Sequence, residues 1–419
     1  MSPIAVFVRS VRPAALACAV SAVAAPAVAG GGSIRALPCG ETGTLSLTTV
    51  NSDGSVFAGM DWEGVFRWTD VGGIERLGYA YEARGISDDG NMVVGYKQNS
   101  SQPGWQAFRW TPAGGMQNLG SWPKDPLELH NYYAMGVTAD GTAVVGHGTG
   151  YNSIVYKRAF RWSDSTGMVA LGVLDEQAIG DSLAAAVTPD GTTIVGSCSG
   201  VVGGIWRWSN AVRWGADGVA QPLATEAAWI ESGVFAVGAD GRNMAGYALD
   251  NAFHAIRWDA DGNAIDLGLI PGASSAIALG ISGDGSMVVG QCPPSKSGFS
   301  TAFVWTEATG ILPLADFLMA NGIDTSDWDH LITASAISRN GRVIVGEGSY
   351  QGCTTSFIVD LGTACPADLD GNGAVTGFDL GLLLSQWGAP GSGDLDGSGA
   401  VGGADLGLLL SAWGPCSGG

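Results

Sequence analysis

One phrase recurs seven times along the chain: an alternating apolar lead, an Asp-Gly pair and a Val-Val-Gly-like ending. The pairs are Asp53-Gly54, Asp89-Gly90, Asp140-Gly141, Asp190-Gly191, Asp240-Gly241, Asp284-Gly285 and, with asparagine for aspartate, Asn340-Gly341. Asp-Gly between alternating apolar runs predicts a hairpin with a type I′ turn, whose two central residues need positive φ. A second phrase, Ala-Phe-Arg-Trp with a Leu-Gly ending, lies between the pairs, as at 107–120. Each repeat therefore predicts two hairpins, or four antiparallel strands.

The length of the repeat selects the architecture. Successive Asp-Gly pairs lie 36 to 56 residues apart, and about 40 to 50 residues per four-stranded unit is the period of a propeller blade. One blade cannot bury both of its faces, so blades stack radially and a closed ring completes the stack. The sequence thus predicts an all-β fold over residues 30–362, a seven-bladed β-propeller of four-stranded blades. A linear β-solenoid fits less well because its repeats are shorter and its ends need caps.

The two ends of the array predict how the ring closes. The seventh repeat finishes with an apolar strand at 356–361 and lacks a fourth strand, whereas segment 32–37 has the pattern of one. We expect this N-terminal segment to complete the seventh blade, because strand edges would otherwise remain unpaired. Cys39 follows the segment, and Cys353 lies between the second and third strands of the same blade. Both loops lie on one face, so we predict a Cys39–Cys353 disulfide.

The repeated phrases resemble those of the extracellular HAF-repeat family of exported bacterial proteins. The Ala-Phe-Arg-Trp, Leu-Gly and Asp-Gly positions carry this resemblance over about residues 34–361. The chain departs from the pattern at Val212 and Val304, and at Val359, where tryptophan is expected. The resemblance implies a propeller and export, and it implies no settled biochemical activity.

The first 29 residues have the pattern of a signal peptide. Arg9 and Arg12 form a basic region, residues 14–23 are apolar, and Ala27-Val28-Ala29 fits a cleavage site. We therefore expect a secreted, extracellular protein with no membrane span in the mature chain, since no later run of 18 apolar residues occurs. Six cysteines remain after cleavage, and an even number favours disulfides. The net charge of −20 argues against nucleic acid as a partner, because binding to phosphates needs basic patches.

The C-terminal segment, residues 363–419, has a different pattern. Two acidic stretches lie 26 residues apart. Each places oxygen donors at loop positions 1, 3 and 5, glycine at 6 and aspartate at 12, as in an EF-hand calcium loop. The predicted ligands are Asp368, Asp370, Asn372, the Ala374 carbonyl, Thr376 and Asp379 in the first loop, and Asp394, Asp396, Ser398, the Ala400 carbonyl and Asp405 in the second. We expect two Ca²⁺ ions, with the second bound more weakly because Gly402 brings no side-chain oxygen.

A helical phrase follows each loop. In the first, Leu380, Leu383, Leu384 and Trp387 fall on one helical face. The pair predicts a small α-helical calcium-binding domain of two EF-hand-type loop–helix units. A domain of about 50 residues needs further stabilisation, which calcium and a predicted Cys365–Cys416 disulfide would provide.

The doubled loop resembles a dockerin domain over about residues 365–419, and its Gly-Pro-Cys ending resembles that of GC-type dockerins. The resemblance implies calcium-dependent docking to a cohesin-like protein or cell-surface scaffold. In the better-known dockerins, loop positions 10 and 11 are polar and contact the receptor. Here these positions are Gly377, Phe378, Gly403 and Ala404. The partner of this tail is therefore expected to differ from an ordinary cohesin.

The sequence indicates no catalytic residue. It contains four histidines, none at metal-ligand spacing from another, and no G-x-S-x-G, H-E-x-x-H or P-loop motif. We expect His147 in an ordinary loop. Tryptophans that recur once per repeat are expected to pack between blades; these are Trp68, Trp110, Trp162, Trp214, Trp258 and Trp305. Less regular Trp105, Trp122 and Trp229 are the candidates for ligand contact, and insertions 121–132 and 315–332 are the expected carriers of any specific function.

Two functions follow from these patterns. The first is a secreted, non-catalytic binding or structural propeller, anchored through its calcium-dependent tail, with polysaccharide left open as a ligand. The second is a dockerin-bearing glycoside hydrolase or polysaccharide lyase that uses the cleft of the propeller. Resemblance to dockerins favours the second hypothesis, whereas the missing catalytic motifs favour the first.

Overall fold

The computed structural model describes residues 32–38, 44–98, 104–122, 129–152, 154–174, 181–202, 205–294, 298–362, 367–369, 374–389, 391, 393–396 and 398–415. The predicted signal peptide lies outside these residues, and so do five predicted site residues: Cys39, Cys365, Asp370, Asn372 and Cys416. None of the described helices has the length and apolar character that crossing a bilayer requires.

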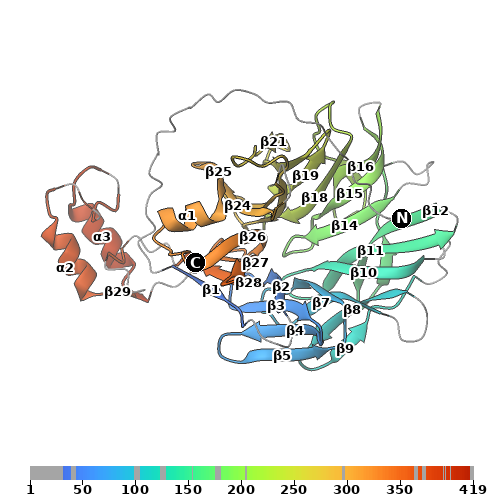
Figure 1. The fold of residues 1–419 in the computed structure, drawn as a ribbon, viewed down its shortest axis with the longest axis horizontal. Helices are drawn as coiled ribbons and strands as arrows, with labels where there is room; N and C mark the ends of the chain where they lie inside the picture. Colours follow the sequence, from blue (N-terminus) through green and yellow to red (C-terminus); the bar gives the residue numbers. More distant parts are fainter. Residues whose placement is uncertain are drawn as a thin grey trace.

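Seven antiparallel sheets of four strands each follow one another around a ring, from blue to orange in Figure 1. The first strands of the blades lie innermost and contact one another in succession. They are β2 (Ser46–Val50), β6 (Glu82–Ile86), β10 (Leu129–Val137), β14 (Ser182–Val187), β18 (Glu231–Val237), β22 (Ile277–Ile281) and β26 (Trp328–Ile337). The prediction of a seven-bladed propeller with four-stranded blades is confirmed.

The remaining strands lie further out in each blade. The second strands are β3 (Val56–Asp61), β7 (Val93–Gln98), β11 (Ala143–Asn152), β15 (Ile194–Val202), β19 (Met244–Leu249), β23 (Met287–Cys292) and β27 (Val343–Tyr350). The third strands are β4 (Gly64–Thr69), β8 (Trp105–Thr111), β12 (Ile154–Ser163), β16 (Ile205–Trp214), β20 (Phe253–Trp258), β24 (Thr301–Thr306) and β28 (Cys353–Asp360). The outermost strands are β5 (Gly73–Gly78), β9 (Gly115–Asn118), β13 (Gly167–Ala170), β17 (Ala220–Pro222), β21 (Ala264–Asp266), β25 (Gly310–Pro313) and β1 (Ser33–Ala36).

The N-terminal strand closes the ring. The seventh blade has the order β1-β28-β27-β26, and β1 pairs antiparallel with β28 from Ser33↔Asp360 to Ala36↔Phe357. The predicted completion of this blade by segment 32–37 is therefore confirmed. Cys353 begins β28, but Cys39 lies outside the described residues, so the bridge between them stays a prediction.

Seven apolar clusters hold the blades together, each made by two neighbouring blades. In one of them, Trp258 of the fifth blade packs on Val195 and Ala211 of the fourth. Five of the recurrent tryptophans are buried in this way, and Trp68 packs against the cluster that joins the seventh blade to the first. Val359 takes the tryptophan position in the seventh blade and is buried too. The packing role predicted for these positions is confirmed.

Part of the insertion at 315–332 belongs to this core, and the expectation that the insertion carries function stays a prediction. It contributes most of helix α1 (Leu314–Ala320) and the start of β26. Leu314, Phe317 and Leu318 are buried in the cluster between the sixth and seventh blades. The insertion therefore fills space between blades. Cys198 and Cys292 are likewise buried in clusters as free thiols, so neither of them forms a disulfide.

The Asp-Gly turns are hairpin turns, but the predicted type I′ geometry is wrong. In the first turn only Gly54 has positive φ, at 83°, and its N–H donates to the Asn51 carbonyl. Asp53 accepts instead from the N–H of Ser55 at 2.9 Å. This carboxylate holds the left-handed glycine in a longer loop, so one positive φ is enough.

The glycine that ends each Val-Val-Gly phrase has a different role from the turn glycines. These residues lie inside second strands, opposite a register shift in the first strand; they are Gly59, Gly95, Gly146, Gly196, Gly246, Gly290 and Gly346. A Cβ on any of them would lie under 3.0 Å from a carbonyl oxygen of the first strand. Only glycine allows the backbones to approach this closely.

The C-terminal segment contains two nine-residue helices, α2 (Gly377–Ser385) and α3 (Gly403–Ser411), and the short pair β29 (Ala374–Val375) and β30 (Gly414–Pro415). Its core consists of Ala367, Val375, Leu383, Val401 and Leu409. The predicted apolar face is only partly right. Leu383 is buried, whereas Leu384 is half exposed and Trp387 lies beyond the end of α2, because the helix ends at Ser385.

Candidate functional site

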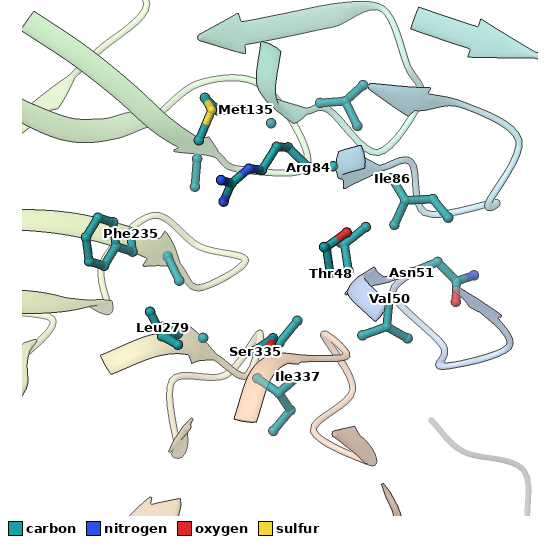
Figure 2. Close-up of a pocket in the computed structure, with 18 of the residues that line it drawn as sticks. Thr48, Val50, Asn51, Arg84, Ile86, Met135, Phe235, Leu279, Ser335 and Ile337 are labelled. Atoms are coloured by element: carbon teal, nitrogen blue, oxygen red, sulfur yellow. The ribbon is translucent and has the colours of Figure 1, made fainter. Parts of the chain in front are cut away.

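A channel of about 680 Å³ runs through the centre of the propeller and is lined by the first strands of all seven blades. Figure 2 shows side chains of these strands around one opening, among them Arg84, Phe235 and Ile337. Most of the lining is backbone and small or aliphatic side chains. The channel is thus a consequence of ring closure, with few groups for chemistry.

The charged groups of the channel are paired with one another. Arg84 contacts Glu82 at 2.9 Å, and Arg339 contacts Asp88 at 2.8 Å. The second pair joins the seventh blade to the second across the end that carries the Asp-Gly turns. Backbone hydrogen bonds tie neighbouring turns together at this end, from Asn340 N–H to the Ser52 carbonyl, for example. The turns on the Asp-Gly face are therefore held in place by contacts between neighbouring blades.

The opposite face carries the connections between second and third strands and those between blades, because strand direction alternates within a blade. There, four aromatic side chains line a cleft of about 400 Å³, namely Trp62, Tyr79, Tyr81 and Trp105. We call this the aromatic cleft. Its first three rings are 64%, 76% and 57% exposed. The sequence analysis proposed Trp105 for ligand contact but missed the other three. Their signal was the clustering of aromatic residues in one tight turn, at Trp62, and in one blade connection, at Tyr79 and Tyr81.

Rings beneath the aromatic cleft form a continuous series. Tyr81 lies 4.7 Å from Trp105 and 5.6 Å from Tyr96, measured between ring centroids. Tyr96 then meets Tyr133 at 4.9 Å, and Tyr133 stacks on His147 at 5.0 Å. The Tyr96 hydroxyl donates to Glu82, and burial together with this carboxylate raises the pKa of Tyr96 well above its usual 10.0. These ring contacts hold the Tyr81 and Trp105 side chains of the aromatic cleft in place.

His147 lines a second cavity on the same face as the aromatic cleft, of about 380 Å³, which is lined by residues of the third, fourth and fifth blades. It lies in strand β11, so the expectation of an ordinary loop is wrong. Burial, with Lys157 and Arg84 nearby, lowers the pKa of His147 from 6.5 to about 3. Its Nδ1 atom is buried without a hydrogen-bond partner. The ring is therefore neutral across the physiological range.

The two remaining tryptophan candidates are packed against other side chains, Trp229 in full and Trp122 in part. Trp229 is 4% exposed and packs in the cluster between the fourth and fifth blades, so its proposed contact role is wrong. Trp122 packs edge-on against Tyr132 and Phe160. Residues 123–128 of the same insertion lie outside the described part of the chain.

The second acidic loop of the C-terminal segment brings its predicted ligands together. Carboxylate oxygens of Asp394, Asp396 and Asp405 all lie within 4.8 Å of one another. Asp405 is buried in the first turn of α3, and hydrogen bonds from the N–H groups of Asp396 and Gly402 lower its pKa. Ser398 lies at the rim, where its hydroxyl donates to the Ala400 carbonyl at 3.3 Å. Three converging carboxylates form a donor set suited to a hard divalent cation.

The first loop is described in part. Asp368 and Asp379 are both fully buried, while Asp370 and Asn372 lie outside the described residues. Asp379 stands in the first turn of α2, where it accepts from the Thr376 N–H at 2.7 Å and from the Thr376 hydroxyl at 3.1 Å. Asp405 takes the equivalent place with Gly402, so the two loops share one design.

The predicted partner positions lie at the helix starts. Gly377 and Phe378 open α2, and Gly403 and Ala404 open α3. Phe378 is 78% exposed. Leucines of both helices and the tryptophan that follows each helix are also exposed, namely Leu382, Leu384, Trp387, Leu408, Leu410 and Trp413. An apolar surface of this kind is typical of a protein interface.

Among solved structures, the chain is similar to seven-bladed and related propellers. It matches oligogalacturonate lyase from Vibrio parahaemolyticus with 13% identity and a TM-score of 0.50, over 78% of this chain and 96% of that one. An oligogalacturonate lyase in complex with manganese matches with 12% identity, a TM-score of 0.50 and the same coverage. The β-propeller domain of the Trilobed protease from Pyrococcus furiosus matches with 11% identity and a TM-score of 0.50, over 75% and 95% of the two chains.

At such low identities these similarities show the fold alone. No family model matches the chain, and no curated protein matches it either. The protein is a seven-bladed β-propeller, and its activity has to be argued from its own residues.

Proposed function

We propose that this protein is an exported, non-catalytic binding module whose C-terminal segment is a calcium-dependent docking tail. The observation that carries this proposal is the convergence of three carboxylates within 4.8 Å in the second loop. The first loop repeats its pattern with buried Asp368 and Asp379. Carboxylates this close together repel one another unless a cation lies between them, and one of the three, Asp405, is buried. Calcium fits best, because every predicted donor is an oxygen.

Calcium would stabilise a tail whose own core is small. Among the described residues of the tail, five buried side chains form that core and four partly buried leucines pack against it, and a segment of about 50 residues generally needs further stabilisation. A Cys365–Cys416 bridge would support it, as Cys39–Cys353 would support the ring closure. Both disulfides belong to this proposal.

The proposed partner of the tail is a cohesin-like protein or a cell-surface scaffold. Exposed Phe378 and the exposed leucines and tryptophans of α2 and α3 supply the apolar contact area. Because loop positions 10 and 11 are glycine, phenylalanine and alanine, recognition would rest on apolar packing. Export follows from the signal-peptide pattern at residues 1–29.

Calorimetry of the full chain tests the tail. We expect about two equivalents of Ca²⁺ for the native sequence and about one for Asp405→Asn, because position 12 closes the second loop. Asp261→Asn, at an exposed propeller turn, is the matched control and should bind as the native chain does. Chelation should lower helical circular dichroism. Absence of calcium binding in the native chain would refute the docking proposal.

A second candidate function is a polysaccharide lyase or glycoside hydrolase. The observation in its favour is the cavity lined by His147, Lys157, Asp181, Glu231 and Tyr247, which gathers acid, base and hydroxyl groups on one face. Its test is product detection by chromatography with galacturonan, alginate, xylan and glucan as substrates. Turnover that disappears in Lys157→Met would establish the enzyme and overturn the non-catalytic proposal.

A further inference from the structure

We infer that the aromatic cleft binds a neutral polysaccharide chain, an inference that rests on the proposed binding function and names its ligand. The cleft lies on the face opposite the Asp-Gly turns and takes its rings from the first two blades. Trp62 comes from the turn between β3 and β4, Tyr79 and Tyr81 from the connection between the blades, and Trp105 from the start of β8.

Exposure of these rings is the first argument. Trp62, Tyr79 and Tyr81 are each more than half exposed, although burial of an aromatic side chain is strongly favourable. Single exposed apolar residues are common, but three around one hollow mark a contact surface. The volume of about 400 Å³ is within the range of small-molecule sites. The face of a pyranose ring presents C–H groups that stack on aromatic rings, while its edge presents hydroxyl groups.

Rigidity is the second argument. The N–H of Trp105 donates to Asn131 Oδ1 at 2.9 Å, and Asn131 donates in turn to Thr149 at 3.1 Å. The Tyr81 N–H donates to the Tyr96 carbonyl at 3.1 Å. A ligand therefore meets rings of Tyr81 and Trp105 that are already ordered, which lowers the entropic cost of binding.

The charge of the cleft points to a neutral sugar. Its polar lining consists of Thr44, Ser46 and Gln98, with Asp61 as the charged residue. The Asp61 carboxylate is 3% exposed and held by Arg76 at 2.7 Å. Among the described residues, the lining therefore has no cation to meet a uronate or sulfate group, and the net charge of −20 repels a polyanion. Hydroxyl and amide groups suit the hydroxyls of an uncharged chain.

The position of the cleft favours a chain over a single sugar. Ser46 and Met60 line both the aromatic cleft and the central channel, so the two hollows adjoin. The rings are supplied by two blades and face a cleft that opens to solvent. Successive sugar units can therefore contact successive rings along this face.

The test is calorimetric titration of the full chain with hexasaccharides of glucose, xylose, mannose and galactose, and with an oligogalacturonide as the anionic comparison. We expect binding of at least one neutral hexasaccharide and weaker binding of the oligogalacturonide. Trp62→Ala should raise the dissociation constant about tenfold or more, as removal of an aromatic anchor does. Trp62→Tyr should retain most of the affinity. Trp413→Ala, a half-exposed tryptophan of the tail, is the matched control and should bind like the native chain.

Three results would overturn the inference: no binding of any neutral hexasaccharide at millimolar concentration, tighter binding of the oligogalacturonide, or unchanged affinity in Trp62→Ala. Calcium binding measured on the same samples separates the two proposals. If the native chain binds calcium but no sugar, only the proposal for the aromatic cleft is refuted. If the native chain binds sugar but no calcium, only the proposal for the docking tail is refuted.

Discussion

The propeller and the C-terminal segment achieve order by different means. Seven buried clusters join the blades, and the largest fully buried side chains all belong to the propeller. The tail has one small cluster of five residues, and its other buried groups are the carboxylates Asp368, Asp379 and Asp405. A ring of blades can be stable through apolar packing alone, whereas the tail, in our proposal, depends on a cation.

Aspartate shows the same contrast. In the propeller turns each carboxylate is satisfied by its own loop: Asp89 accepts from the Ser87 hydroxyl at 2.6 Å and from the Asn91 N–H at 2.9 Å. The Ser87 hydrogen bond leads the set that lowers the pKa of Asp89. In the tail, Asp394, Asp396 and Asp405 converge on one another. One residue type therefore serves as a turn former in one region and as a predicted ligand in the other.

The largest effect should come from a tryptophan between blades. Trp258 is fully buried, and its indole N–H donates to the Ala224 carbonyl at 2.8 Å. Trp258→Ala should destabilise the propeller by about 3–5 kcal/mol, because it leaves a cavity and an unpaired carbonyl. Differential scanning calorimetry should show that the propeller unfolds at a lower temperature. Trp387→Ala, half exposed in the tail, is the control, and an equal loss there would contradict the contrast between the regions.

A close-approach glycine should have the next effect. A Cβ at Gly196 would lie under 3.0 Å from the Leu183 carbonyl oxygen. Gly196→Ala should therefore destabilise the propeller by about 1–3 kcal/mol through a forced backbone shift. Urea denaturation followed by tryptophan fluorescence measures this loss. An unchanged free energy of unfolding would show that the first strand can move away from the second without cost.

Acid should weaken the propeller through His147. Folding lowers the pKa of His147 from 6.5 to about 3, so between these values the unfolded chain binds the extra proton. Stability should therefore fall as the pH decreases from 6.5 towards 3. His147→Phe keeps the stack on Tyr133 and removes the titration, so its melting temperature should depend less steeply on pH over this range. Parallel curves for the two proteins would exclude His147 as a source of acid sensitivity.

The smallest effect should come from a helical glycine in the tail. Gly407 lies inside α3, and a Cβ there would meet nothing within 4 Å. Gly407→Ala should stabilise the helix by about 0.5–1 kcal/mol, because alanine loses less backbone entropy on folding. Thermal circular dichroism at the helical band measures the gain. A loss of stability would place an unseen neighbour at this surface.

Much of the fold could be predicted from the sequence because the repeat is local and periodic. Seven Asp-Gly pairs predicted seven blades, and the apolar segment 32–37 predicted the strand that closes the ring. The type I′ turn was wrong because the Asp53 carboxylate builds a longer loop around a single left-handed glycine. His147 was misplaced because strand β11 extends past the phrase that ends in Gly146.

The candidate sites differ in the same respect. The convergence of Asp394, Asp396 and Asp405 could be predicted because these residues lie within twelve consecutive residues of one loop, a spacing that the chain itself fixes, while calcium binding stays a prediction. The aromatic cleft could not, since Trp62, Tyr81 and Trp105 come from three separate segments that follow no motif. Trp229, irregular in sequence like Trp105, proved to be a core residue.

The sequence by itself determined the number of blades, their closure by the N-terminal strand and the local geometry of the acidic loops. These features depend on hydrogen bonding and side-chain period over short stretches, which the order of residues specifies directly. Only the tertiary structure decided which tryptophans are core and which face solvent, why each Val-Val-Gly phrase ends in glycine, and where the aromatic cleft lies. Those outcomes depend on distances between strands and blades, and such distances are set only when the ring packs.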